Sequence, residues 1–374
     1  MSVNNPTIAL ITILFVFQQQ LWADRFEQKY RIETIAGNGM RGDTPGARDA
    51  RTVPVDLPFG VEYGPDRRLY ITTVGSHRIL RLDLSNGSII SVAGNGRKGY
   101  SGDGKLATKA MLNEPYEVRF DSKGNMLILE MKNHLLRRID AKTGIISTMA
   151  GDGVAGNRGD GGPARKARFR YPHSLAVDKH DNIYIADLGN HRVRRINAKS
   201  QLIETVAGNG RGGRPKKGGL AKSQPLLTPQ GIAIRKGILW IASFQGHVVW
   251  RVRLKSGVVE RMAGTGKRGY TGDGKDPRQA TFDGPRGVTL SPAGILYVVE
   301  GENNVIRAFD TARNKIRTVA GAGPKRHLFV GDGVPAVGAP LWQPHGVIVS
   351  PDGCLIISDT INHRVRKLVP IHGK

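Results

Sequence analysis

Hydrophobic residues in this chain occur in short runs in which apolar and polar positions alternate. One stretch shows the pattern clearly, with runs at residues 174–177, 182–186, 192–196 and 202–207. Turn-forming clusters separate such runs, for example Asp-Ser-Lys-Gly-Asn at 121–125. Alternation with period two, bounded by glycine, proline and asparagine, is typical of β-strands, and the 3.6-residue period of a helix is absent. The pattern therefore predicts an all-β fold of short strands.

The strand pattern repeats six times along the chain. Glycine recurs in an Ala-Gly-Asn-Gly-like segment, and a proline opens the first apolar run of each unit. The glycines are 57, 57, 57, 56 and 57 residues apart: Gly37, Gly94, Gly151, Gly208, Gly264 and Gly321. The prolines are 57, 57, 57, 56 and 59 residues apart: Pro58, Pro115, Pro172, Pro229, Pro285 and Pro344. Two independent markers thus give one period.

Six units of four strands, each too small to bury both faces alone, predict a six-bladed β-propeller around a central channel. The last unit supplies only three runs, at 346–350, 354–358 and 364–369. The run at 30–36 precedes the first complete unit, so it is expected to complete the last blade and to remove an exposed sheet edge. Residues 24–374 are therefore expected to form a single propeller domain.

The N-terminal segment predicts export. Residues 1–23 carry no charged side chain, and residues 8–17 form an apolar run that three glutamines end. This run is too short to span a bilayer and is typical of a signal peptide, with cleavage expected after Ala23. The interpretation is a secreted, periplasmic or extracellular protein with no transmembrane segment after processing; an uncleaved anchor is the alternative.

Composition narrows the functional classes. The chain has 374 residues, 39% of them hydrophobic, which excludes disorder. Its single cysteine, Cys354, excludes an intramolecular disulfide framework and cysteine-rich zinc sites. Lys and Arg number 56 against 31 Asp and Glu, giving a formal net charge of +25. Such a charge favours polyanionic partners and says nothing about the fold.

Several motifs resemble those of the NHL-repeat family. They are Asn-His-Arg-Val-Arg-Arg-Ile at 190–196, Asn-His-Arg-Val-Arg-Lys at 362–367 and Ile-Tyr-Ile-Ala-Asp at 183–187. The Gly-Tyr-Ser/Thr-Gly-Asp-Gly loops at 99–104 and 269–274 resemble those of secreted bacterial members and related extracellular propellers. The resemblance covers residues 30–370. It implies a six-bladed propeller used mainly as a binding platform, with a minority of relatives acting as lyases or lactonase-like hydrolases.

Three recurring residue series are interpreted as structural. Histidines at one blade position are expected to bond a neighbouring turn: His77, His134, His191, His247 and His363, with Asn304 in the fifth unit. Acids four residues before them and bases four residues after them, such as Glu130 and Arg138, are expected to form ion pairs. Aspartates of the Gly-Asp-Gly loops are expected to accept backbone N–H groups: Asp103, Asp160, Asp273 and Asp332.

The residue after each blade-opening proline varies in chemistry, as a site on a repeated scaffold would. These residues are Phe59, Tyr116, His173, Gln230, Arg286 and His345. Related metal-dependent lyases place Pro-His pairs on three alternate blades to hold zinc; here only His173 and His345 match, on blades three and six. The three-histidine zinc site is therefore broken.

Three interpretations of these channel residues stay open. One is a polar ring that holds water, and another is a binding site for a small anion or saccharide that also involves Trp342. The third is a two-histidine zinc site at His173 and His345 with Tyr116 or Arg286 polarising the substrate of a lyase or lactone hydrolase. No cofactor is otherwise expected.

The fourth unit replaces its Gly-Asp-Gly loop with a basic segment that contains Arg211, Arg214, Lys216 and Lys217. This segment predicts an anionic contact, such as an anionic polysaccharide or an envelope polymer. Nucleic acid is the weaker alternative, because export and the lack of an aromatic series among these bases argue against RNA. The sequence therefore favours an exported binding platform for an anionic extracellular or envelope partner. A channel enzyme and an RNA-binding platform are the alternatives.

Overall fold

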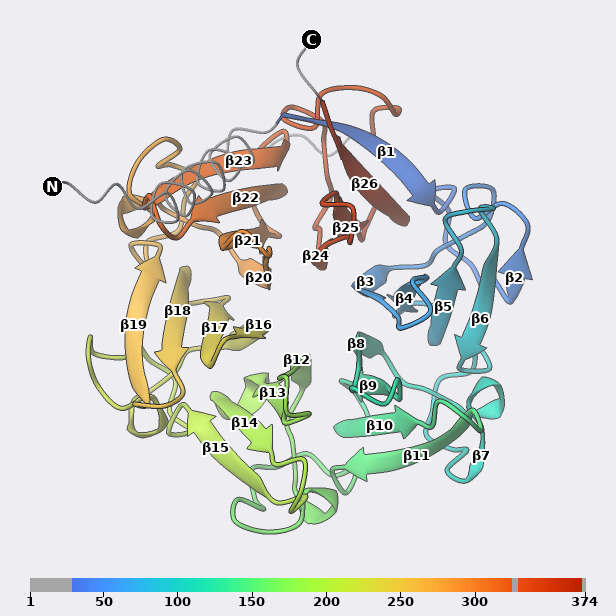
Figure 1. Ribbon diagram of the computed structural model, residues 1–374, viewed down its shortest axis with the longest axis horizontal. Helices are drawn as coiled ribbons and strands as arrows, with labels where there is room; N and C mark the ends of the chain where they lie inside the picture. The colour runs from blue at the N-terminus through green and yellow to red at the C-terminus, as the bar shows by residue number, and fades with distance from the viewer. Residues whose placement is uncertain (1–28, 325–328, 372–374) are drawn as a thin grey trace, which may run out of the picture.

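The computed structural model describes residues 29–324 and 329–371. Six antiparallel sheets stand like blades around a central channel, as Figure 1 shows, and this arrangement confirms the predicted propeller. Four sheets have four strands, and the first two blades carry an additional two-residue strand at the outer edge. The predicted signal peptide, residues 1–23, lies outside the described residues.

The first three blades follow the chain from the channel outward. Blade one contains β3 (Pro58–Tyr63), β4 (Leu69–Thr73), β5 (Arg78–Leu82), β6 (Ile89–Ala93) and the edge strand β2 (Gly46–Ala47). Blade two contains β8 (Pro115–Phe120), β9 (Met126–Glu130), β10 (Leu135–Ile139), β11 (Ile145–Ala150) and the edge strand β7 (Lys105–Leu106). Blade three contains β12 (Pro172–Val177), β13 (Ile183–Asp187), β14 (Arg192–Ile196) and β15 (Ile203–Ala207).

The last three blades repeat this order, and blade six takes its outer strand from the start of the described chain. Blade four contains β16 (Pro229–Arg235), β17 (Ile238–Ser243), β18 (Val248–Arg253) and β19 (Val258–Ala263). Blade five contains β20 (Pro285–Leu290), β21 (Ile295–Glu300), β22 (Val305–Asp310) and β23 (Lys315–Gly321). Blade six contains β24 (Val347–Val349), β25 (Leu355–Asp359), β26 (Arg364–Pro370) and β1 (Tyr30–Ala36).

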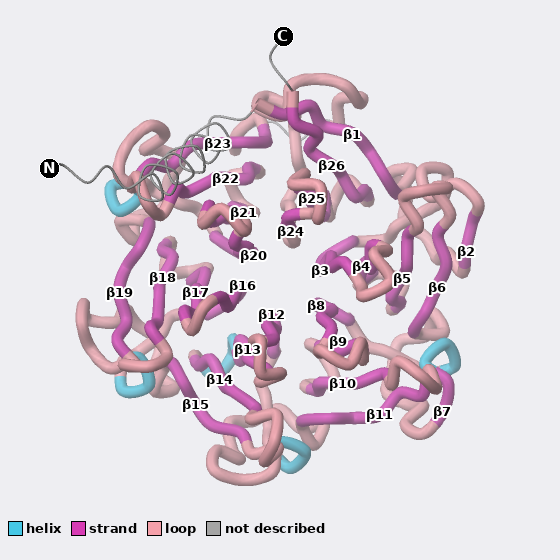
Figure 2. The backbone as a smooth tube through the Cα atoms, in the orientation of Figure 1, coloured by secondary structure: helices cyan, strands magenta, loops and turns pink. Residues whose placement is uncertain are grey.

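Within residues 29–324 and 329–371, helix is limited to short 3₁₀ turns, which Figure 2 shows in cyan between the strands. In the described part of the chain these turns are η1 (Ala107–Lys109), η2 (Ala164–Lys166), η3 (Leu188–Asn190), η4 (Ala221–Ser223) and η5 (Pro277–Gln279). Most lie in the loops that connect one blade to the next.

Closure of the ring follows the prediction. Strand β1 pairs antiparallel with β26, from Tyr30 opposite Pro370 to Ala36 opposite Val365. Ile32 of β1 is fully buried against blades five and six. Because the first described strand and the last one share a sheet, no blade is left with an open outer edge at the junction of the two chain ends.

The hydrophobic core lies between blades. Leu127 and Leu129 of β9, for example, pack with Leu175 and Ile185 of blade three. Each of these four side chains is at most 1% exposed. A single blade would expose one such face, so the blades stabilise one another.

Glycine lets the innermost strands approach closely at the channel. A Cβ on Gly231 would lie 2.1 Å from the carbonyl oxygen of Arg286, and one on Gly346 would lie 2.3 Å from the carbonyl oxygen of Phe59. No side chain fits at these distances. The inner strands therefore crowd together and narrow the channel.

The residue before each blade-opening proline is held with positive φ, at 37–59°. Gly284 occupies this position in blade five, whereas Glu114, with φ 50°, occupies it in blade two. A non-glycine residue in this conformation costs about 1–2 kcal/mol. The greater freedom of glycine in the unfolded chain offsets about 0.5–1 kcal/mol of that strain.

We therefore expect Glu114→Gly to raise the free energy of unfolding by about 0.5–1 kcal/mol, measured by urea denaturation. Gly284→Ala is the reverse control. Its Cβ would lie 2.8 Å from both Glu302 and Phe244, so this variant should be less stable. A loss of stability in Glu114→Gly would show that the strain argument is wrong.

Candidate functional site

The six residues that follow the blade-opening prolines converge at one end of the channel. Five lie at the N-terminal ends of β3, β8, β12, β16 and β20, and the sixth lies just before β24. We call these residues the channel ring: Phe59, Tyr116, His173, Gln230, Arg286 and His345. The ring unites six of the predicted site residues, because equivalent positions of a propeller meet only at its axis.

Aromatic contacts run across the ring. Phe59 stacks on His345 with ring centroids 3.7 Å apart, and its edge meets Tyr116 at 4.5 Å. Tyr116 in turn contacts His173 at 4.8 Å. The centroids of His173 and His345, from opposite blades, are only 5.7 Å apart. The channel is therefore closed here by side chains in mutual contact.

Polar contacts complete the ring. The side-chain amide of Gln230 lies 2.8 Å from Nε2 of His173. The guanidinium of Arg286 lies 3.4 Å from Nδ1 of His345, forms an ion pair with Glu302 and lies 5.3 Å from the ring centroid of Phe244. Arg286 and His173 are 8% and 9% exposed, so these polar groups depend on one another for partners.

Burial and a neighbouring positive charge keep the two histidines of the ring neutral. Burial, reinforced by the charge of Arg286, lowers the pKa of His173 to about 3. The same two causes hold the pKa of His345 well below its usual value. Burial also raises the pKa of Tyr116, so the phenol keeps its proton. At neutral pH Arg286 therefore carries the charge of the ring.

The donor set does not fit the zinc site considered for His173 and His345. Zinc in a catalytic site takes three protein ligands and one open position, and here only two imidazoles are present. The cationic Arg286 lies beside His345, where it would repel a metal ion. Among the described residues, no three His, Cys, Asp or Glu side chains are grouped so that they could hold a metal. We derive no chemistry through zinc at the ring.

Beneath the ring lies a cavity of about 30 Å³, large enough for one or two water molecules. Its lining includes Glu117 and Arg119, whose side chains form an ion pair at 2.6 Å. Arg119 also pairs with Glu62 at 3.3 Å. The sequence analysis missed this charged group. The signal was the charge at the second and fourth residues after the prolines, because the other blades carry Gly or Ser at the second position and Ala, Thr or Ile at the fourth.

Other predicted site residues lie apart from the cavity. Trp342 is 41% exposed and does not line the cavity beneath the ring. The basic segment of blade four follows β15 and leads to η4, and its Arg211, Lys216 and Lys217 are exposed. Arg214 bonds the carbonyl of Gly266 in the loop after β19. The channel and the basic segment are therefore separate candidate sites.

The recurring histidines have the predicted structural role. Each of the five histidines in this series has positive φ. Its Nδ1 accepts a hydrogen bond from the backbone N–H of the residue before the opening proline of the next blade. In blades two and three these bonds join His134 to Tyr171 and His191 to Thr228, both at 3.3 Å. Asn304 takes the same place in blade five through its side-chain oxygen, 2.7 Å from the N–H of Gln343. The series ties neighbouring blades together.

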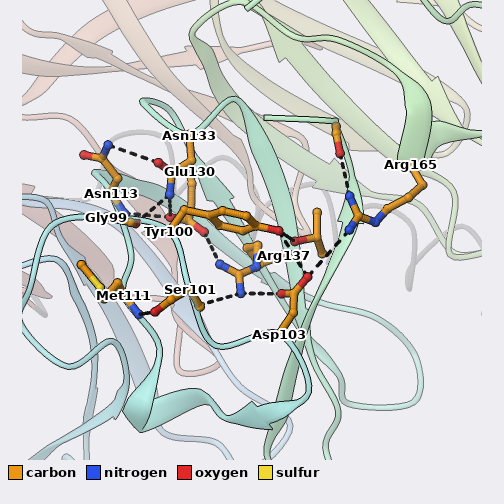
Figure 3. Close-up of polar contacts among 12 residues, drawn as sticks. Gly99, Tyr100, Ser101, Asp103, Met111, Asn113, Glu130, Asn133, Arg137 and Arg165 are labelled. Carbon is orange, nitrogen blue, oxygen red and sulfur yellow. Dashed lines mark hydrogen bonds and ion pairs between the residues drawn. The ribbon is translucent and has the colours of Figure 1, made fainter. Parts of the chain in front are cut away.

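The prediction for the charged series needs correction. The base that pairs with Glu130 is Arg137, at 3.0 Å, and not Arg138, because alternate strand residues face opposite sides. Arg137 also binds Asp103 of the Gly-Asp-Gly loop at 2.6 Å, as Figure 3 shows. The loop aspartate thus serves a buried arginine instead of forming only a local turn. Asn133 donates to Glu130 at 2.7 Å and completes what we call the arginine network.

The arginine network is present in four blades, whereas blades one and four lack both the buried arginine and the inner acid; blade one keeps a loop acid, Asp43, which binds Arg78. The other three copies centre on Arg194, Arg307 and Arg366, each fully buried and each paired with two acids. In blades one and four Leu80 and Trp250 replace the arginine, and Thr73 and Ser243 replace the inner acid. The arginine and the inner acid are absent from the same two blades, as expected because a buried charge without its partner is costly.

The described residues include no helix that is long and apolar enough to cross a membrane.

Sequence comparison identifies related repeats. The NHL repeat family matches residues 169–196. The chain is 30% identical over 279 residues to Protein SUPPRESSOR OF QUENCHING 1, chloroplastic, of Arabidopsis thaliana, covering 72% of this chain and 26% of that protein. It is 28% identical over 283 residues to NHL repeat-containing protein 2 of Gallus gallus, covering 68% of this chain and 38% of that protein. The chain spans less than two fifths of either relative.

Solved structures agree on the fold. An auxiliary nutrient binding protein from Bacteroides thetaiotaomicron superposes with a TM-score of 0.66 at 15% identity, covering 92% of this chain and 77% of that one. A gluconolactonase from Xanthomonas campestris superposes with a TM-score of 0.58 at 13% identity, covering 91% and 90%. Identities this low establish the fold alone. Together with the repeat motifs and the six blades, these comparisons show that the chain is an NHL-repeat six-bladed β-propeller.

Proposed function

We propose that this protein is an exported binding platform for an anionic polysaccharide or envelope polymer, and that it binds through the basic face around the channel ring. Export rests on the apolar run at residues 8–17. The observation that carries the proposal is the combination of a closed channel end with a surrounding surface of exposed bases. One protein with this fold is named an auxiliary nutrient binding protein, so the fold is compatible with a binding role.

The closed ring favours surface binding over chemistry inside the channel at this end. A cavity of about 30 Å³ has no room for a sugar lactone or a peptide. Opening it would separate His173 from Gln230 and expose the buried charge of Arg286. These contacts make the ring a stable plug, so a partner meets the outer surface first.

Basic residues surround this closed end. The Gly-x-Gly turn after the outermost strand is followed by an exposed base in several units: Arg41, Arg97, Arg211 and Lys267. Two of these loops bond the turns near the ring, because Asn133 donates to the carbonyl of Gly99 and Asn303 to that of Gly269, both at 2.9 Å. The bases and the ring therefore share one face.

Intramolecular pairing leaves this surface strongly positive. Buried arginines and surface arginines bind many of the carboxylates, as Arg137 binds both Asp103 and Glu130. The sequence carries an excess of 25 positive charges, and on this face the side chains of Arg97, Arg211 and Lys267 are exposed to solvent. Such a surface attracts polyanions and speeds their association at low ionic strength.

A charge-reversal variant tests the proposal. We expect R211E/K216E/K217E to lower the affinity for heparin, used as a sulfated polysaccharide probe, at least tenfold at 0.1 M salt. Its affinity should also depend less steeply on salt, because fewer counterions are displaced. Arg214 is left in place because it bonds Gly266. Calorimetric titration over a salt series measures both quantities.

A matched control separates local contact from total charge. K123E/K142E/K199E makes the same change in net charge at exposed turns that follow the inner and third strands, on the opposite face. Its loss of affinity should be much smaller. Equal losses in both variants would show that no dedicated face exists. Tighter binding of single-stranded RNA than of heparin would favour the RNA alternative.

The channel-enzyme alternative has its own test. Hydrolysis of gluconolactone by the wild type, lost in both His173→Ala and His345→Ala, would overturn the platform proposal. We expect no difference between the wild type and these variants.

A further inference from the structure

The channel has a second mouth at the opposite end from the ring. It is lined by the C-terminal ends of all six inner strands, β3, β8, β12, β16, β20 and β24, which Figure 1 shows around the axis. The space here is about 510 Å³, within the usual size of a small-molecule site. We call this space the funnel. It differs from the ring in being open and empty of plugging side chains.

Large apolar side chains form part of the funnel wall, beside polar side chains and backbone groups. Tyr63, Phe120, Ile234 and Leu290 line it from four different blades, together with several alanine, valine and isoleucine side chains. These wall residues are only partly buried, so a ligand could remove their apolar surface from water. The one cation at the rim, Arg235, is held to the carbonyl of Ser291. The body of a matching ligand is therefore apolar.

The floor of the funnel carries more acidic than basic side chains. Glu62 and Arg119 line it directly, and Glu117 binds Arg119 from the side of the small cavity. Two carboxylates share this one guanidinium. Arg119 is occupied by Glu117 through one terminal nitrogen and lies 3.3 Å from Glu62 through Nε. When all three groups are ionised, the floor carries one excess negative charge.

Burial makes this excess charge costly in the empty protein. It raises the pKa of both Glu62 and Glu117, despite the favourable charge of Arg119. A positively charged ligand group beside Glu62 would offset this cost, whereas an anion would add a second like charge at short range. Glu62 is the accessible partner, since its side chain is 27% exposed against 14% for Glu117.

We propose that the funnel is a binding site for small amphipathic amines, with the apolar body on the channel wall and the ammonium group beside Glu62. The site is separate from the basic face, and its ligand has the opposite charge. The overall positive charge of the protein opposes the approach of an amine from a distance, so selectivity comes from short-range contact at the floor. Salt screens the distant repulsion more than this partly buried contact.

Three probes of one shape test the charge requirement. We expect 4-phenylbutylamine to bind at least tenfold more tightly than 4-phenylbutanol, and 4-phenylbutyrate to bind least. Titration calorimetry or ligand-observed NMR with the full chain measures this order. Amine affinity should stay constant or rise between 0.05 and 0.3 M salt, whereas heparin affinity should fall. This contrast makes failure of the funnel distinguishable from failure of the polysaccharide proposal.

Two variants locate the site. Glu62→Gln should remove the preference for the amine over the alcohol, and Leu290→Ala should weaken both. Glu204→Gln, an exposed acid of an outermost strand, is the control and should change neither. Binding of the carboxylate as tightly as the amine, an unchanged preference in Glu62→Gln, or no binding of the amine at millimolar concentration would each overturn the proposal. Unfolding temperatures of the variants show whether each remains folded.

Discussion

Replacing Arg137 by leucine alone is expected to lower the free energy of unfolding by about 3–5 kcal/mol, the cost of leaving a buried charge without its partner. Glu130 is fully buried and loses its guanidinium, whereas Asp103 keeps a side chain that is 34% exposed and can be solvated. The remaining bonds to Glu130, from Asn133 and the N–H of Asn113, do not neutralise its charge.

Removing the acid as well should restore most of this stability. The double variant Glu130→Thr/Arg137→Leu reproduces the pair that blade one carries, Thr73 and Leu80. In blade one the threonine hydroxyl donates to the carbonyl of Arg78, so the small polar group has a partner. We expect the double variant to lie within about 1–2 kcal/mol of the wild type, since well-packed apolar groups often replace a buried ion pair with little loss.

A double-mutant cycle measures this coupling. The single variants Arg137→Leu and Glu130→Thr and the double variant are compared by chemical denaturation at pH 7.5. Losses that simply add would contradict the assignment of the arginine network as one unit. Arg138→Leu is the matched control: its side chain is 38% exposed and lies 4.0 Å from Asp121, so its loss should cost less than about 1 kcal/mol.

Acidification is expected to weaken the contacts between blades through the recurring histidines. Burial lowers the pKa of His77, His134 and His191 below the ordinary value of 6.5. Each Nδ1 accepts a backbone N–H from the next blade, as His134 does from Tyr171. Protonation turns this acceptor into a donor that faces another donor. The bond therefore exists only with the neutral ring.

The sign follows from proton linkage. Below pH 6.5 the unfolded chain takes up protons at these histidines before the folded chain does. Their contribution to stability is complete above pH 6.5 and is lost as the pH falls through the lower folded pKa. Each titrating histidine contributes at most about 1.4 kcal/mol per pH unit. Glu130 and Glu300 act in the opposite direction, because burial raises the pKa of each to about 7.

An asparagine variant isolates the histidine contribution from these carboxylates. Asn304 already fills the equivalent position in blade five and does not titrate. We expect H77N/H134N/H191N to gain stability relative to the wild type as the pH falls from 7.5 to 5. Unfolding free energies at both pH values measure this difference. A difference that does not change with pH would show that these rings do not need to be neutral.

The repeat pattern predicted that the charged residues of a blade form ion pairs, but it did not identify which arginine binds Glu130. Spacing in the sequence indicated that the acids and bases form pairs. It favoured Arg138 because a base recurs at that position in most units, but Arg137 lies on the same strand, one residue earlier. The side of the sheet on which each points depends on strand register: Leu135 lies opposite Glu130, which places Arg137 on the buried side. Repeated absence of arginine, inner acid and asparagine in blades one and four would have been the better signal.

The floor of the funnel illustrates the same limit. Glu62 and Arg119 both stand four residues after a blade-opening proline and Glu117 stands two residues after one, so their spacing places them on inner strands but does not show that they touch. They meet because inner strands of adjacent blades approach closely at Gly60, where a Cβ would lie 2.8 Å from the carbonyl oxygen of Tyr116. Channel contacts of this kind depend on the radial packing of the blades.

The sequence by itself determined the all-β class, the six units, the closing strand at 30–36 and the six positions after the prolines that form the channel ring. These features follow from local periodicity and from regular spacing, which a linear chain displays directly. Tertiary structure alone decided that the six ring residues close one end of the channel, that one arginine per network binds two acids, and that the opposite end is an open funnel. Such features join residues far apart in the chain, and their geometry exists only once the blades have packed around one axis.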